Sequence, residues 1–144
     1  MEELSQLTFN RGLIEDASAF AEEASAASWL FLCGDEFGDM EGGLAFDAVQ
    51  AAVPIAAQVP ADPPRELDLD LARRLMTELD ELPRPTLVTC RTGPRSSAVV
   101  YLYAGLKSGA PVDEVLARAD ADEAPFAGDD DLRTFVRRGI EELR

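Results

Sequence analysis

One short stretch of the sequence combines a potential nucleophile with groups that bind anions. It reads Cys90-Arg91-Thr92-Gly93-Pro94-Arg95-Ser96-Ser97 and follows a β-branched run, 86–89, which predicts a buried strand. The apolar run 98–106 after it predicts a helix. A cysteine between a strand and a helix N-terminus faces free backbone N–H groups and the positive end of the helix dipole. These groups attract anions and stabilise a thiolate, so we expect Cys90 to act as a nucleophile.

Several neighbours of Cys90 have side chains suited to holding an anion. Arg95 is expected to make a bidentate contact with a phosphate-like group. Ser96 is expected at the N-cap of the helix, where its hydroxyl would accept backbone N–H groups. Pro94 has no N–H, which removes one donor from the loop. The remaining loop members are Arg91, expected at the rim, and Thr92, Gly93 and Ser97.

Composition excludes several other kinds of site. The chain has 144 residues, 47% of them hydrophobic, which predicts one globular domain, 1–144. It has no histidine, so it holds neither a Ser-His-Asp triad nor a Cys-His pair, and we expect no metal and no other cofactor. The net charge of −15 argues against a nucleic-acid or membrane partner. Two cysteines and the absence of a signal peptide predict a cytoplasmic protein.

Predicted strands and helices alternate along the chain. We therefore expect an α/β fold with a four- to five-stranded, mainly parallel sheet flanked by helices. The predicted strands are 6–9, in a hairpin with 13–14, then 29–33, 55–59 and 86–89. The predicted helices are 17–26, 44–53, one capped by Asp68 or Asp70 that ends near Leu82, 97–107, 111–121, and one that begins within 129–131 and runs to Leu143.

Ligands of parallel sheets bind beyond the carboxyl ends of the strands. Cys33, Asp62 and Cys90 each follow a predicted strand, so we expect them at one edge of the sheet. Asp62 lies 28 residues before Cys90 and is a candidate general acid, although it could equally be a solvated loop residue. Asp35 and Asp39 are weaker candidates for that role. Cys33 is a possible redox partner of Cys90, but a buried strand residue is the favoured interpretation.

The segment from Val59-Pro60-Ala61-Asp62 to the Cys90 loop resembles dual-specificity phosphatases, in which an aspartate loop, a helix and a strand precede a Cys-x5-Arg-Ser loop. Over nearly its whole length the chain is most similar to the phosphatase-like domain family related to the beta-lactamase-hydrolase-like proteins, whose loop reads C-R-[ST]-G-x-R-S. This resemblance implies a tyrosine-phosphatase-like fold and a phosphate-containing substrate. It assigns Cys90 as nucleophile, Arg95 as the oxyanion clamp, Asp62 as general acid and the Ser96 hydroxyl as a donor to the leaving thiolate.

The length of the loop keeps a second chemistry open. Four residues separate Cys90 from Arg95, where the phosphatases have five. The shorter loop resembles that of rhodaneses and implies a sulfurtransferase that takes a sulfur-containing anion and carries a persulfide on Cys90. The upstream rhodanese signatures are absent, and Thr89 stands where phosphatases have histidine. A third alternative is a non-catalytic anion-binding module, in which Cys90 is an ordinary buried cysteine.

Overall fold

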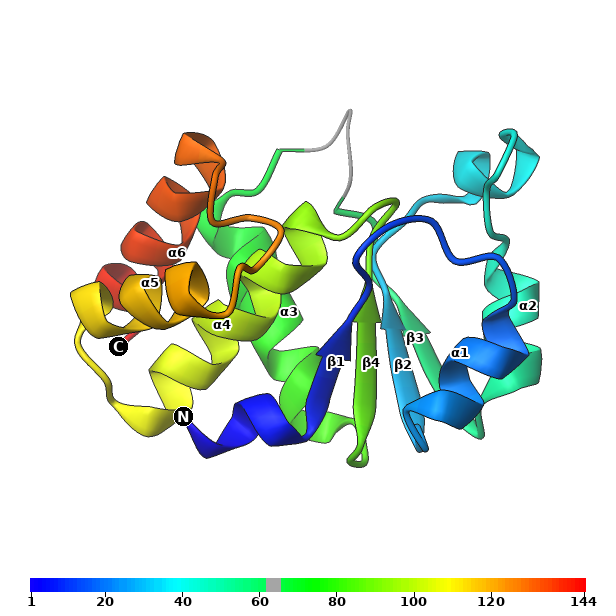
Figure 1. Cartoon of the computed structure of the whole chain (residues 1–144), viewed down its shortest axis with the longest axis horizontal. Helices are drawn as coiled ribbons and strands as arrows, with labels where there is room; N and C mark the ends of the chain where they lie inside the picture. The colour runs from blue at the N-terminus through cyan, green and yellow to red at the C-terminus, as the bar shows by residue number, and fades with distance from the viewer. Residues whose placement is uncertain (62–65) are drawn as a thin grey trace.

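Four parallel strands form the centre of the computed structural model, which describes residues 1–61 and 66–144 (Figure 1). Their order in the sheet is β1-β4-β2-β3. Every residue of β2 and β4 is buried, as their apolar sequences predict for strands covered on both faces. The strands are β1 (Leu7–Phe9), β2 (Ser28–Phe31), β3 (Ile55–Gln58) and β4 (Thr86–Thr89).

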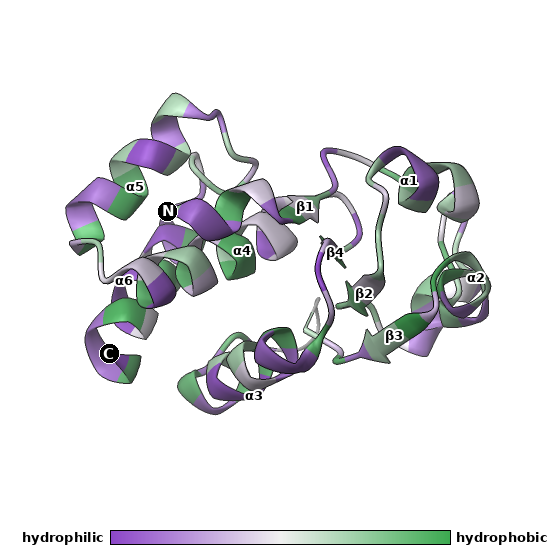
Figure 2. Ribbon diagram, turned by 90° about the horizontal axis from the view of Figure 1, so that it is seen from below, coloured by the Kyte–Doolittle hydropathy of each residue, from purple (hydrophilic) through white to green (hydrophobic). Residues whose placement is uncertain are grey.

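Helices cover both faces of this sheet (Figures 1 and 2). On one face lie α1 (Ala17–Glu23) and α2 (Phe46–Ala52), packed on an apolar cluster around Trp29 and Phe31. The other face carries the larger cluster and four helices, of which α4 is the most deeply buried. These helices are α3 (Leu69–Glu81), α4 (Pro94–Ser108), α5 (Val112–Ala121) and α6 (Asp130–Leu143). None of the helices described in 1–61 and 66–144 is long and apolar enough to cross a membrane.

Local sequence signals account for where three helices begin. The side chains of Asp16, Asp68 and Asp129 each accept the backbone N–H of the residue three positions on, which satisfies a donor that the helix leaves unpaired. The N-termini of α3 and α6 therefore lie where the sequence predicts them. Two short 3-10 helices complete the described structure, η1 (Glu2–Ser5) and η2 (Asp35–Asp39).

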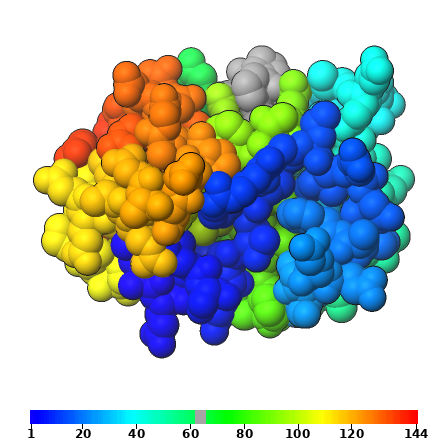
Figure 3. Space-filling model, in the orientation of Figure 1, coloured from blue at the N-terminus to red at the C-terminus, as the bar shows by residue number. Residues whose placement is uncertain are grey.

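The predicted N-terminal hairpin is wrong. Strand β1 pairs in parallel with β4, and residues 13–14 form no strand. The chain leaves the sheet after β1 because Asn10 turns inward and Arg11 donates to the backbone carbonyls of Asp122 and Glu123. In Figure 3 the N-terminal segment lies against the segment that follows α5. Contacts with residues 80 to 112 positions away therefore override the local turn signal at 10–12.

Helix α4 begins three residues earlier than predicted, at Pro94. Gly93, not Ser96, is its N-cap, with a φ of 116° that glycine adopts readily. Proline fits the first helical position because its ring presets φ and its missing N–H has no partner to lose there. Arg95 and Ser96 consequently lie in the first turn of α4, and the Ser96 backbone N–H points at the Cys90 sulfur.

Candidate active site

The Cys90 sulfur lies at the N-terminus of α4, immediately beyond strand β4. Its Sγ accepts the backbone N–H groups of Gly93, at 3.1 Å, and Ser96, at 3.3 Å. The Ser96 hydroxyl oxygen is 3.4 Å from the same sulfur. The side chain is only 3% exposed. Two amide donors and a helix dipole aimed at one sulfur stabilise negative charge on it, which is the arrangement that a thiolate nucleophile needs.

The side chain of Asn10, the residue that follows β1, is hydrogen-bonded to both ends of the Cys90 loop. Its Oδ1 accepts the N–H of Cys90 at 3.2 Å and the hydroxyl of Ser96 at 2.9 Å. Its Nδ2 donates to the carbonyls of Cys90, at 2.9 Å, and Gly12, at 3.0 Å. The side chain is 1% exposed. One amide thus joins both ends of the loop. No local sequence signal indicates this role, because only the β1–β4 pairing brings Asn10 to Cys90.

Gly93 makes close packing between these two segments possible. A Cβ at Gly93 would lie 2.1 Å from the carbonyl oxygen of Asn10, well inside van der Waals contact. The positive φ would strain any other residue as well. The glycine of the Cys90 loop is therefore required for its conformation, independently of any ligand.

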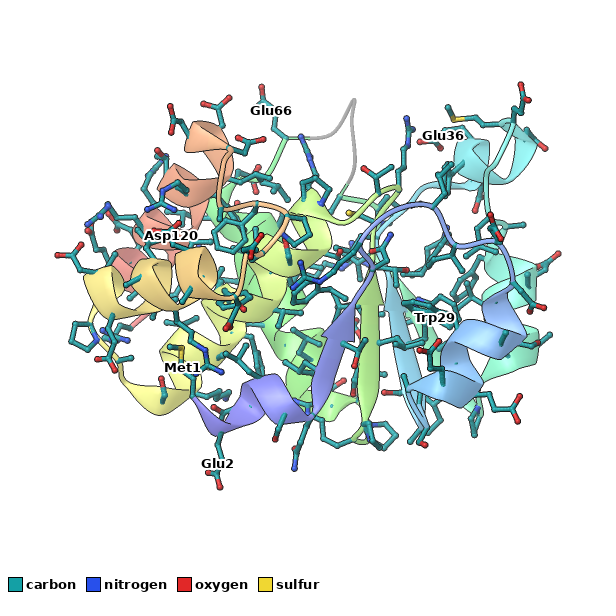
Figure 4. All side chains as sticks on the ribbon, in the orientation of Figure 1. Met1, Glu2, Trp29, Glu36, Glu66 and Asp120 are labelled. Carbon is teal, nitrogen blue, oxygen red and sulfur yellow. The ribbon has the colours of Figure 1, made fainter. Side chains whose placement is uncertain are left out.

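The two loop arginines are directed to different neighbours. Arg95 is half-buried and donates to the carbonyl of Ala61, the residue that ends the described part of the loop after β3. Arg91 reaches the opposite side, where its guanidinium is 3.8 Å from the Glu36 carboxylate and 5.6 Å from the centre of the Phe37 ring. Glu36 belongs to η2, which stands beyond the carboxyl end of β2 in Figure 4. Arg91 therefore lies at the rim, next to η2.

A cavity of about 360 Å³ opens over Cys90. Its lining combines the loop with the start of α6, which the sequence did not connect to the site. The lining residues are Cys90, Arg91, Thr92, Pro94, Arg95, Asp129, Asp131 and Leu132. A larger cavity of about 620 Å³ lies elsewhere, beside Tyr103, Lys107 and the C-terminal end of α6. No cysteine is among the described residues that line that cavity, whereas the smaller one opens over Cys90 and its amide donors, so the smaller cavity is the candidate active site.

Other predicted site residues lie apart from the sulfur or outside the described chain. Asp62 falls in 62–65, beyond the described residues. The Ser97 hydroxyl already has two backbone partners, because it donates to the Pro94 carbonyl and accepts the N–H of Phe126. Asp35, one of the weaker candidate acids, accepts from Gln58 at 3.1 Å, and Asp39 lies at the end of η2.

Cys33 lies on the opposite face of the sheet from Cys90. It is fully buried in the cluster beneath α1 and α2, whereas Cys90 belongs to the cluster beneath α4. The structure contains no disulfide between them. Within the described residues, no group of three His, Cys, Asp or Glu side chains is placed to hold a metal ion.

Thr89, which stands where phosphatases have histidine, has a structural partner. Its buried hydroxyl accepts the indole N–H of Trp29 at 2.8 Å, a bond between neighbouring strands. Trp29 in turn packs against Phe20 of α1, with ring centroids 6.0 Å apart. Thr89 therefore anchors the carboxyl end of β4, from which the Cys90 loop starts, to the neighbouring strand β2.

Comparison with solved structures identifies the fold. Tk-PTP in its active form matches with a TM-score of 0.75 and 15% identity, over 96% of this chain and 93% of that chain. The chain has a tyrosine-phosphatase-like fold. A protein from Neisseria meningitidis Z2491 matches with a TM-score of 0.69 and 19% identity, over 93% of each chain. The catalytic core of the S. cerevisiae PP-IP phosphatase SIW14 matches with a TM-score of 0.63 and 13% identity, over 95% of this chain and 82% of that chain.

The sequence itself matches no family model and no curated protein. The structure confirms the expected parallel sheet with flanking helices and the expected tyrosine-phosphatase-like fold. The finer assignment to the beta-lactamase-hydrolase-related family stays a prediction.

Proposed function

We propose that this protein is a cysteine-dependent phosphatase that hydrolyses phosphate monoesters through a phosphocysteine. The Cys90 thiolate attacks phosphorus, an S–P bond forms, and the bond from phosphorus to the leaving oxygen breaks. The observation that carries the proposal is the Cys90 sulfur held by the Gly93 and Ser96 amides in a tyrosine-phosphatase-like fold. The Arg95 guanidinium, which lines the same cavity, would bind the phosphoryl oxygens.

Asp62 is the proposed donor of a proton to the leaving oxygen. Support comes from its neighbour in the chain, since the Ala61 carbonyl accepts from Arg95. In the second step water attacks phosphorus, the S–P bond breaks, and Asp62 takes the proton from water. The thiolate then leaves, and we propose that Ser96, whose oxygen is 3.4 Å from the sulfur, rotates its hydroxyl to donate to it.

The first test is turnover of a small aryl phosphate by purified protein. We expect Cys90→Ser to lower kcat by more than about a thousandfold, because the hydroxyl is a far weaker nucleophile. Cys33→Ser is the matched control, since Cys33 is buried on the other face of the sheet. Equal activity in the wild type and Cys90→Ser would exclude the proposed mechanism, and absence of turnover from the wild type would exclude the function.

A sulfurtransferase is the second candidate, and one feature favours it, the separation of only five positions between Cys90 and Arg95. In that reaction the Cys90 thiolate attacks the outer sulfur of thiosulfate, a persulfide forms, and sulfite leaves. Intact-mass measurement after thiosulfate treatment separates the two candidates. Our proposal predicts unchanged mass, whereas one added sulfur on Cys90 would favour the sulfurtransferase.

Finer aspects of the proposal follow from the same residues. We propose membership of the family related to the beta-lactamase-hydrolase-like proteins, on the C-R-T-G-P-R-S loop. A cytoplasmic location is proposed because both cysteines are thiols in this structure. Neither a nucleic acid nor a membrane is a proposed partner, given the net charge of −15.

A further inference from the structure

The cavity over Cys90 is lined by acidic as well as basic side chains. Arg91 and Arg95 contribute two positive charges, and Asp129 and Asp131 contribute two negative ones. With Cys90 as the thiolate that the proposed mechanism requires, the described part of the lining has a negative formal charge. Among the residues that the structure describes, the site therefore offers a phosphate dianion no surplus of positive charge from its side chains.

Further contacts reduce the positive charge available to a ligand. The Arg91 guanidinium already faces the Glu36 carboxylate at 3.8 Å. The chain as a whole carries a net charge of −15. A ligand with several phosphate groups would thus bring additional negative charge into a negative surrounding, and its binding would be opposed.

The two aspartates are placed to meet groups just outside the cavity. Both are exposed and belong to the N-cap and first turn of α6. Asp129 is held in place because its Oδ1 accepts the N–H of Leu132 at 3.1 Å. Cationic side chains beside a bound phosphate could therefore reach two exposed carboxylates, of which that of Asp129 is held in place, without entering the cavity.

From this charge distribution we propose that the site selects phosphorylated protein segments whose flanking residues are lysine or arginine. The inference rests on the proposed phosphatase function and adds the substrate class. Asp129 and Asp131 are the specificity-determining residues, and the phosphate itself is bound by Arg95 and the loop. One charge pair at about 7 Å in water changes an equilibrium about threefold, so exchanging a basic for an acidic flank should change kcat/KM by about fivefold or more.

The test compares two phosphotyrosine peptides that differ only in flanking lysines or glutamates, with a small aryl phosphate as reference. We expect the lysine peptide to have the higher kcat/KM, and the ratio to shrink when salt is raised from about 20 mM to about 500 mM, because the interacting charges are exposed. In the Asp129→Asn, Asp131→Asn double variant the ratio should fall toward one. Asparagine also serves as an N-cap, so α6 keeps its start.

Asp130→Asn is the matched control. Asp130 lies between the two aspartates and is exposed, but it lies outside the cavity lining. It should retain most of the peptide preference. Equal kcat/KM for both peptides, a preference for glutamate, or an equal loss of preference in Asp130→Asn would overturn the inference. Turnover of the aryl phosphate in those cases would leave the proposed function standing, whereas no turnover of any substrate would remove both.

Discussion

Replacing Asn10 with alanine should destabilise the reactive conformation of the Cys90 loop and lower kcat/KM. Asn10 follows β1, whereas the Cys90 loop follows β4. The change removes the acceptor for the Cys90 N–H and the Ser96 hydroxyl, and the donor to the Cys90 carbonyl. These groups are buried, and the shortened side chain leaves them without their present partner. Ser96 keeps an alternative acceptor in the Gly93 carbonyl at 3.1 Å, so its hydroxyl would turn away from Asn10.

The size of the effect follows from those lost bonds. A buried backbone group left without a hydrogen bond costs about 1–3 kcal/mol, and two such groups belong to Cys90 itself. We expect a loss of about 2–6 kcal/mol in the stability of the loop conformation. If the loop must be in that conformation to react, kcat/KM should fall by at least about 30-fold.

The assay combines three measurements on Asn10→Ala. They are kcat/KM with a small aryl phosphate, the rate of Cys90 alkylation by iodoacetamide at neutral pH, and thermal unfolding. Ser97→Ala is the matched control, because Ser97 is buried like Asn10, lies in the first turn of α4, and loses two side-chain hydrogen bonds on substitution. Both variants should be less stable, but only Asn10→Ala should lose alkylation rate, by about tenfold or more.

The role of Asn10 would be refuted by a simple result. If Asn10→Ala unfolds at a lower temperature yet alkylates and turns over substrate within about twofold of the Ser97→Ala variant, the amide contributes to stability alone.

Three further predictions concern single positions. Gly93→Ala should destabilise the protein by about 2–4 kcal/mol in chemical denaturation, because its Cβ would meet the Asn10 carbonyl; a change below about 0.5 kcal/mol would contradict the close approach. Arg95→Lys should lower kcat/KM for an aryl phosphate by about tenfold or more, since lysine offers no bidentate contact; unchanged kinetics would remove Arg95 from the site. A hydrogen bond from Lys107 holds the pKa of Asp80 below its usual range, so Asp80 stabilises the fold above the ordinary carboxyl pKa and this contribution is lost as pH falls through the folded-state pKa. Asp80→Asn should therefore be less stable than the wild type at neutral pH, by about 1 kcal/mol or less because the pair is partly exposed, and the difference in unfolding free energy should vanish in acid; a difference that persists there would contradict the assignment.

The parts of the fold that sequence predicts are those with local causes. The apolar runs of β2 and β4 indicate buried strands, and the caps at Asp68 and Asp129 indicate helix starts, because propensity and burial act within a few residues. The Cys90 loop is predictable for the same reason, since strand, glycine turn and helix follow one another directly.

The missed features depend on strand order and on contacts between distant segments. The turn signal at 10–12 favoured a hairpin, whereas the pairing of β1 with β4 made Asn10 a support for the Cys90 loop. Likewise, nothing near Asp129 and Asp131 in the sequence indicates that α6 begins beside a loop some 40 positions earlier. Cys33 and Cys90 both follow buried strands, but the face on which each side chain lies depends on register.

The most direct test of the account is to trap the covalent intermediate. The wild-type protein is mixed with an aryl phosphate, quenched in acid on the timescale of one turnover, and analysed by intact mass and peptide mapping. We predict one added phosphoryl group, on the peptide that contains Cys90, and none in Cys90→Ser. Rapid turnover with a phosphoryl group on another residue, or with none at all under conditions in which an intermediate must accumulate, would contradict Cys90 as the nucleophile.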